Sequence, residues 1–569
     1  MEGGPQVSTS DHQGSAPVSW CPPYAKVPSG ELISEDFLTK RLPDVGAKKV
    51  DRFSVDEASL LVGRHSTTFR LLLEWSPSSM DESKPVGGNA AAAATVGQNQ
   101  DRVQPDGIKA DGGCDPVSSV FVKRMTCREL PARTLIKWRT SIASYRAEAT
   151  FFKTVAGSKA LGPIVPHSFW VHVDDRLGEQ GSTGGVDGGG DVDGRQQDEE
   201  ELIKGLQESC FMMITEDLGA GWEQAVALDL ERAKAVFSAV AHLHASFWPN
   251  PAESESGGFP PPPPAAGEGE GGRRYARGLH EQGTFWNLDK RNPEDLEGLE
   301  REYENLLGRF RPLFPASWFE PAQQQGGGRG ATPSLGRRLA SRALDLDAAV
   351  LGREGGLSLS RGGEVGRVAG GGGKRGRTLV HGDLKTWNVF FRKGAWGEVG
   401  ADGTGGGSGG GWKASTAPAR GRVKIIDWQW CGEGLAAADV AYVMCTSLEP
   451  TVLLSKEKEL LDHYHAELSR GLEDRFGKPP GEGGGGEAST RSSWYPMEQL
   501  EDDYRVAFLD YMRCVVGTLW KGLTPGKMEK NRTSGPGLSL INRSIQHMQW
   551  MIEKATRLLD ELDNLEEKK

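Results

Sequence analysis

The spacing of apolar residues along the chain predicts both strands and long amphipathic helices. Apolar or alternating runs typical of strands occur at 62–75, 120–124 and 211–219. Apolar residues at helical spacing occur at 31–49, 141–156, 229–248, 452–476, 494–523 and 536–565. The two patterns together predict a chain that mixes strands and helices around an apolar core.

Glycine-rich segments interrupt these elements. The 569 residues include 77 glycines, far too many for one packed domain, and the glycines cluster. The clusters predict loop insertions at 80–117, 176–200, 251–274, 352–377, 393–421 and 478–490, and residues 1–30 read as a disordered tail. The folded part is therefore shorter than the chain, about 350–400 residues in two lobes.

Three polar residues follow apolar runs closely. The apolar run 379–380 leads into a turn that carries Asp383 and Asn388, and the short strand 423–426 is followed at once by Asp427. Transfer of a phosphoryl group from Mg-ATP needs a carboxylate to orient the acceptor hydroxyl, and an Asn and an Asp to hold magnesium. Because loop length costs little stability, the long segment between the two strands still allows Asn388 and Asp427 to lie side by side.

These residues carry a resemblance to a known family. The sequence His381-Gly382-Asp383-x4-Asn388, followed by a strand and Ile426-Asp427-Trp428-Gln429, resembles the aminoglycoside phosphotransferase and choline kinase superfamily. It is most similar to the ecdysteroid-kinase-like (CHK kinase-like) branch, and residues 242–248 resemble a signature of that branch. The resemblance implies an α+β, two-lobed protein-kinase-like fold, with a small antiparallel-sheet N-lobe and a mainly helical C-lobe.

The resemblance also implies boundaries, cofactors and roles. The N-lobe would span 31–220 and the C-lobe 221–565. ATP and Mg²⁺ would be the cofactors, and a small molecule would accept the γ-phosphoryl group on a hydroxyl. Asp383 would be the base or acceptor-orienting carboxylate, and Asn388 and Asp427 would hold the magnesium ion.

Two residues of the first lobe fit the binding of the α/β-phosphates. Lys123 lies within an apolar strand and needs a partner there, and Glu148 lies on the 141–156 helix. A strand lysine followed by a helix glutamate resembles the pair of kinase folds, in which the glutamate holds the lysine. The alternative is a solvated lysine and a surface glutamate.

The rest of the nucleotide site is implied less directly. Gly63, Ser66 and Thr67 fall where the family's phosphate-covering loop lies, although the sequence is not G-x-G-x-x-G and also suits an ordinary hairpin turn. Thr215, Glu216 and Leu218 resemble the hinge whose backbone meets the adenine edge.

Three further residues are expected to act at the turn that carries Asp383. His381 is expected to support the turn by hydrogen bonds rather than to transfer protons. Lys385 departs from the family, where Trp or His is common, and we expect it to neutralise charge on the transferring phosphoryl group; an exposed loop lysine is the alternative. Asp439 is expected to brace the turn, a role compatible with capping a helix.

His242 and His244, two apart on a helix, are expected to be packing residues rather than metal ligands.

The composition argues against certain binding partners and indicates the cellular compartment. The net charge of −11 gives no electrostatic footprint for nucleic acid or an anionic membrane, and the basic, glycine-rich 361–377 segment is better explained as a linker. Seven scattered cysteines without a C-x-x-C pair suit reduced thiols. No secretory signal or apolar span is visible. A cytoplasmic protein is the expectation.

Other functions stay open. The acceptor could be choline, ethanolamine, an aminoglycoside or a sugar. The Asp-Leu-Lys-x-x-Asn match also permits a protein kinase, against which stands the lack of Asp-Phe-Gly, Ala-Pro-Glu and G-x-G-x-x-G patterns. The third alternative is a catalytically silent kinase fold that serves as a binding module.

Overall fold

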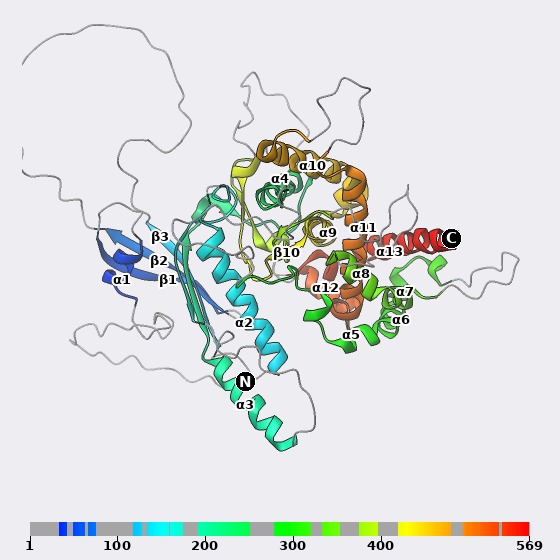
Figure 1. Cartoon of the computed structure of the whole chain (residues 1–569), viewed down its shortest axis with the longest axis horizontal. Coiled ribbons are helices and arrows are strands. Elements are labelled where there is room, and N and C mark those ends of the chain that lie inside the picture. The colour runs from blue at the N-terminus through cyan, green and yellow to red at the C-terminus, as the bar shows by residue number, and fades with distance from the viewer. Residues whose placement is uncertain are drawn as a thin grey trace, which may run out of the picture.

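The structure is a computed structural model of the chain, and the described residues form two lobes (Figure 1). The described residues are 33–42, 49–62, 66–75, 118–127, 134–158, 160–174, 192–250, 278–319, 333–352, 375–396, 419–479, 493–533 and 538–567. The predicted tail 1–30, Gly63 and the greater part of each predicted insertion lie outside them.

The first lobe is built on a five-stranded antiparallel sheet in the order β1-β2-β3-β5-β4. Its strands are β1 (Val50–Val62), β2 (Thr67–Trp75), β3 (Ser119–Thr126), β4 (Ser168–Asp174) and β5 (Cys210–Glu216). In β3, Val122 and Lys123 point to opposite faces because side chains alternate along a strand. One face of the sheet therefore carries Val122 and the other carries Lys123.

Each face of the sheet is covered by helix. Helix α1 (Glu35–Arg41) covers one face, where Phe37 meets Trp170 edge-on at 5.1 Å and joins a cluster that contains Val122. Helix α2 (Leu135–Thr150) lies against the other face, as Figure 1 shows. It begins six residues before the predicted 141–156 helix, and it continues as a π-helix over Phe151–Val155.

Helix α3 (Val192–Gln207) lies beside α2 and corrects one prediction. Its first half falls within the predicted insertion 176–200, so that insertion ends earlier than expected. The helix was missed because no apolar residue occurs between Val192, its first residue, and Leu202, so no helical period of apolar residues is visible over most of its length.

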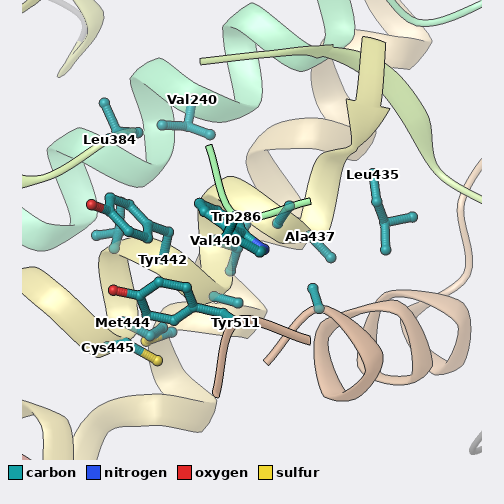
Figure 2. Close-up of a cluster of buried hydrophobic side chains, with 14 of the residues drawn as sticks. Val240, Trp286, Leu384, Leu435, Ala437, Val440, Tyr442, Met444, Cys445 and Tyr511 are labelled. Atoms are coloured by element: carbon teal, nitrogen blue, oxygen red, sulfur yellow. The ribbon is translucent and has the colours of Figure 1, made fainter. Parts of the chain in front are cut away.

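The second lobe is mainly helical. Its longer helices are α4 (Leu230–Ser246), α6 (Leu299–Phe310), α9 (Ala436–Ser447), α10 (Pro450–Phe476), α11 (Met497–Cys514) and α13 (Ile545–Glu566), with the shorter α5 (Pro293–Glu297), α7 (Leu335–Ser341), α8 (Ala343–Val350) and α12 (Pro525–Thr533). Helix α10 packs along α4, and α11 packs against α9. Every residue of α9 is buried, so this helix is the centre of the lobe's core (Figure 2).

Two small sheets pack against helices α4 and α9 of the second lobe. Strand β7 (Arg377–Val380) pairs with β10 (Gly432–Leu435), and β8 (Val389–Arg392) pairs with β6 (Trp222–Glu223) and β9 (Val423–Ile425). The β8–β9 pairing is antiparallel, as expected for a hairpin with an expanded loop. An antiparallel-sheet lobe joined to a helical lobe is the predicted α+β, two-lobed, kinase-like architecture.

No helix within the described residues is both long enough and apolar enough to cross a membrane.

Candidate functional site

The turn between β7 and β8, residues 381–388, is folded tightly against two other segments. Gly382 has φ +80°, and a Cβ there would lie 2.4 Å from the Trp430 carbonyl oxygen and 2.5 Å from the Thr284 nitrogen. Thr284 is itself in the left-handed region at φ +78° and donates its backbone N–H to the Trp430 carbonyl. Only glycine fits at position 382, which explains the central residue of His-Gly-Asp.

Asp439 holds the backbone of this turn. Its two carboxylate oxygens accept the N–H groups of His381 at 2.7 Å and Gly382 at 2.9 Å. Burial acts to raise the pKa of Asp439, but hydrogen bonds and nearby histidine charge outweigh burial, so the pKa is lowered and the group stays ionised. The expectation that Asp439 braces the turn agrees with this geometry.

The histidines of the site are hydrogen-bonding residues. His244 contacts Asp439 at 3.3 Å and the Tyr464 hydroxyl at 2.7 Å, while His242 contacts the Ala160 carbonyl. His381 is buried, with Nε2 on the Ile426 carbonyl and Nδ1 accepting the Asp383 N–H. Since both ring nitrogens of His381 are occupied by backbone, a supporting role fits it better than proton transfer.

Asp383 is fixed at both carboxylate oxygens. The Tyr442 hydroxyl donates to Oδ1 at 2.6 Å, and Lys385 Nζ donates to Oδ2 at 2.6 Å. Burial acts to lower the pKa of Lys385, but the charges of Asp383 and Asp427 raise it overall, so the lysine is cationic. The Asn388 amide nitrogen donates to the Asp383 carbonyl at 2.8 Å and so ties the two ends of the turn together.

Asn388 and Asp427 lie on neighbouring strand ends. The Ile426 N–H donates to the Asn388 carbonyl at 2.9 Å, and Asp427 is the next residue along the chain. Asp427 has φ +65°, a left-handed conformation that Asp tolerates better than most residues and that occurs at functional sites. The backbones of the two residues predicted to share a magnesium ion are therefore close together.

Lys123 joins the two lobes. Its Nζ donates to the two Glu148 oxygens at 2.8 and 2.7 Å and to Asp427 Oδ1 at 3.0 Å. Burial acts to lower the pKa of Lys123, but the charges of Asp427 and Glu148 raise it overall. The solvated-lysine alternative is excluded by this geometry.

The two carboxylates share the Lys123 cation unequally. Burial acts to raise the pKa of Asp427, but the charges of Lys123 and Lys385 lower it overall. Burial raises the pKa of Glu148 to about 7, although Lys123 opposes the shift. Asp427 is therefore the firmly ionised partner, as a metal ligand must be.

Of the residues predicted to cover the phosphates, Ser66 and Thr67 lie on or next to β2, close in register to Lys123. Thr67 is in register with Arg124 and directly precedes Thr68, the cross-strand partner of Lys123, and Ser66 precedes them both. Gly63 lies outside the described residues.

The predicted hinge lies where β5 leaves the sheet. Thr215 and Glu216 end β5, and Leu218 follows two residues later. The Glu216 N–H donates to the His167 carbonyl at 2.7 Å, and its carboxylate accepts from the His167 N–H at 3.0 Å. The side chain of Glu216 thus ties the end of β5 to the residue before β4, and the same oxygen lies 3.5 Å from Lys424 Nζ on β9.

The donor set suits a magnesium ion. Asn388 uses its amide nitrogen within the turn, which leaves its Oδ1 as an acceptor, and Asp427 contacts Lys123 through Oδ1. Magnesium prefers oxygen ligands and is commonly bound by one or two side chains together with nucleotide phosphates. These two oxygen-bearing side chains are of the right type to hold it.

Comparison with known proteins agrees with the resemblance seen in the sequence. The profile of the ecdysteroid kinase-like family matches residues 414–475, a span that contains Asp427, Asp439 and Tyr442. No curated protein sequence matches the chain.

Solved structures similar to this chain include an aminoglycoside phosphotransferase, described as putative, and two small-molecule kinases. A putative aminoglycoside phosphotransferase from Ralstonia eutropha has 11% identity and a TM-score of 0.32, with 92% of this chain and 97% of that chain covered. Choline kinase from Cryptosporidium parvum has 8% identity and a TM-score of 0.33, with 94% and 95% covered. A microcompartment-associated aminopropanol kinase has 14% identity and a TM-score of 0.29, with 90% and 91% covered. Sequence identities and TM-scores this low say nothing about the function of this chain, which has to be inferred from its own residues.

Proposed function

We propose that this protein is an ATP-dependent kinase that transfers the γ-phosphoryl group to a hydroxyl of a small molecule. The observation that carries the proposal is the Lys123 ammonium, which contacts Glu148 on α2 and Asp427 after β9 at once. A buried cation shared by these two carboxylates supports a role for Lys123 in phosphate binding and for Asp427 in metal binding, since phosphoryl transfer needs both groups close together.

The nucleotide would lie between an N-lobe of residues 31–220 and a C-lobe of residues 221–565. Lys123, held by Glu148, would contact the α/β-phosphates. Ser66 and Thr67, near the Lys123 end of the β1–β2 hairpin, would approach the phosphates together with Gly63. The backbone from Thr215 to Leu218 would meet the adenine edge.

Asn388 and Asp427 would hold Mg²⁺ against the phosphates. The ion, when bound, would neutralise the phosphate charge that develops during transfer. Asp427 would help to hold the ion, and Lys123, which Glu148 also holds, would contact the phosphates.

Asp383 would orient the acceptor hydroxyl and take its proton, and His381 would hold the turn that carries it. Lys385, which lies on Asp383 at 2.6 Å, would neutralise charge on the transferring phosphoryl group. All of these positions carry a side chain of the required type, which favours an active enzyme over a silent fold.

Nucleotide-induced thermal stabilisation tests the proposal. The melting temperature with Mg²⁺ and a non-hydrolysable ATP analogue should rise by several degrees, and Asp427→Ala should remove the Mg²⁺-dependent part. Asp462→Ala, an exposed acid on α10, is the matched control and should keep the full shift. Equal curves with and without nucleotide would rule out the kinase.

The acceptor should be sought with a metabolite panel. Choline, ethanolamine, an aminoglycoside and a sugar are sensible first members, since the resemblance in the sequence leaves these acceptor classes open. Products heavier by one phosphoryl group, detected by mass spectrometry and absent with Asp383→Asn, would identify the acceptor class.

A further inference from the structure

Tyr442 makes a contact that the proposed function does not use. It lies on α9 three residues after Asp439, so the two side chains share one face of the helix. Asp439 holds the backbone of the turn, while the Tyr442 hydroxyl reaches Asp383 Oδ1 at 2.6 Å. One helix thus fixes both the turn and the carboxylate that the turn carries.

Tyr442 is the donor in this bond. Its side chain is buried, and burial together with the charge of Asp383 raises its pKa well above the ordinary tyrosine value. A phenol that keeps its proton donates to a carboxylate, and a short O–H···O⁻ bond of this kind is among the stronger hydrogen bonds in proteins.

The two oxygens of Asp383 face different surroundings. Oδ1 is turned to Tyr442 inside the core of the second lobe. Oδ2 is turned to Lys385, whose side chain keeps 25% of its surface exposed, and the Asn388 amide nitrogen approaches it at 3.5 Å, the limit of a hydrogen bond. A carboxylate oxygen accepts more than one hydrogen bond, so Oδ2 can accept from Lys385 and from a substrate hydroxyl together.

We propose that Tyr442 is a positioning residue that fixes the Asp383 carboxylate so that Oδ2 is the oxygen that takes the acceptor's proton. The proposal rests on the proposed function. In the transfer step the acceptor O–H bond breaks and its proton passes to Oδ2. The acceptor oxygen bonds to the γ-phosphorus, and the bond from that phosphorus to the bridging oxygen breaks, which releases ADP.

The ring of Tyr442 is held firmly enough for this task. Trp286 stacks on it at 5.1 Å with 16° between the ring planes, and Phe285 and Tyr511 meet it edge-on at 5.7 and 5.0 Å. The Trp286 carbonyl is in turn bound by Arg513. Figure 2 shows Tyr442, Trp286 and Tyr511 gathered beside α9, so the hydroxyl has little freedom to leave Oδ1.

Tyr511 offers a matched control. It is buried next to Tyr442, and within the described residues its hydroxyl has no hydrogen-bond partner. Tyr442→Phe and Tyr511→Phe therefore remove the same atom from neighbouring rings, and only the first removes a bond to Asp383.

The decisive measurement is turnover of Mg-ATP with water as the acceptor, followed by phosphate release. Tyr442→Phe should lower kcat by roughly 10- to 100-fold, part of the effect of a positioned base, and leave the KM for ATP unchanged. Tyr511→Phe should match the wild type in kcat and in the KM for ATP. In an Asp383→Asn background, Tyr442→Phe should have no further effect.

Two outcomes would overturn the inference. One is a Tyr442→Phe enzyme with the same kcat as Tyr511→Phe. The other is an equal fold-loss from Tyr442→Phe in the wild-type and the Asp383→Asn backgrounds, which would show a structural role alone.

A stability measurement separates this failure from failure of the proposed function. If the wild type neither binds nor hydrolyses ATP, the kinase proposal fails, but the Tyr442 bond can still be tested. The melting temperature of Tyr442→Phe should fall below that of Tyr511→Phe, because only Tyr442→Phe leaves a buried carboxylate oxygen without its donor. Equal melting temperatures in the two variants would contradict the bond.

Discussion

Lys123 Nζ lies 3.0 Å from Asp427 Oδ1 although 304 residues separate the two along the chain. The contact joins strand β3 of the sheet lobe to the residue that follows β9 in the helical lobe. Glu148, only 1% exposed, completes the arrangement from α2. Three charged groups from three elements therefore meet where the two lobes meet.

Removing the cation from this group should destabilise the fold. We expect Lys123→Met to lower the free energy of unfolding by about 3 kcal/mol, because it leaves Glu148 buried without its partner. The double variant Lys123→Met/Glu148→Gln should recover a large part of that loss. Urea unfolding followed by circular dichroism measures both values.

Lys458→Met is the control for this prediction. Lys458 pairs with Asp462 on the exposed face of α10, so its loss should leave the midpoint unchanged. If Lys123→Met unfolded at the same urea concentration as Lys458→Met, the buried pair would not contribute to stability.

A side chain at position 382 should be poorly tolerated. Gly382→Ala places a Cβ against two backbone segments at a positive φ, and we expect a loss of about 3 kcal/mol or more. Gly394→Ala, at φ +69° with open space around the Cβ position, should cost only about 1 kcal/mol. Similar losses in the two variants would mean that the 381–388 turn moves away from Trp430 easily.

Four of the five central residues could be predicted from their positions beside or inside an apolar run. Asp383, Asn388 and Asp427 follow apolar runs, and Lys123 stands out inside one. Glu148 was found from its helix and from the kinase resemblance. For these residues the local pattern and the family resemblance agree.

Tyr442 could not be singled out in the same way. It lies in AAADVAYVMCTS, a helix buried on all sides, so no alternation of apolar and polar positions marks it. Its only signal was the spacing of three residues from Asp439, which places both on one helix face.

Thr284 gave no signal at all. A β-branched residue is not expected in the left-handed region, and its position against Gly382 depends on a contact between segments almost a hundred residues apart. Tertiary contacts of this kind lie beyond what local sequence patterns carry.

Lys385 provides a direct test of charge neutralisation. If its ammonium assists the transferring phosphoryl group, Lys385→Met should lower kcat about 100-fold and change the KM for ATP little. Lys393→Met, exposed just beyond β8, should keep the wild-type kcat. An unchanged kcat in Lys385→Met would reduce the residue to a loop lysine.

Stability should fall in mild acid because of buried histidines. Burial lowers the pKa of His547 to about 4 and that of His280 to about 3, against an ordinary value of 6.5. The unfolded chain then binds protons that the folded chain does not, so stability is complete above about pH 6.5 and is lost as the pH falls toward 4. For His547 alone the loss amounts to about 3 kcal/mol across that window.

His547→Met should remove this part of the pH dependence while it preserves an apolar, space-filling side chain. The backbone of Leu448 interacts with the buried imidazole and acts to raise its pKa, against the larger effect of burial, and the substitution removes this contact as well. The free energy of unfolding, measured in urea at half-unit steps from pH 7 to 4.5, should fall less steeply for the variant than for the wild type. Parallel curves would mean that His547 is protonated in the folded chain, and the acid sensitivity would then have to come from other groups.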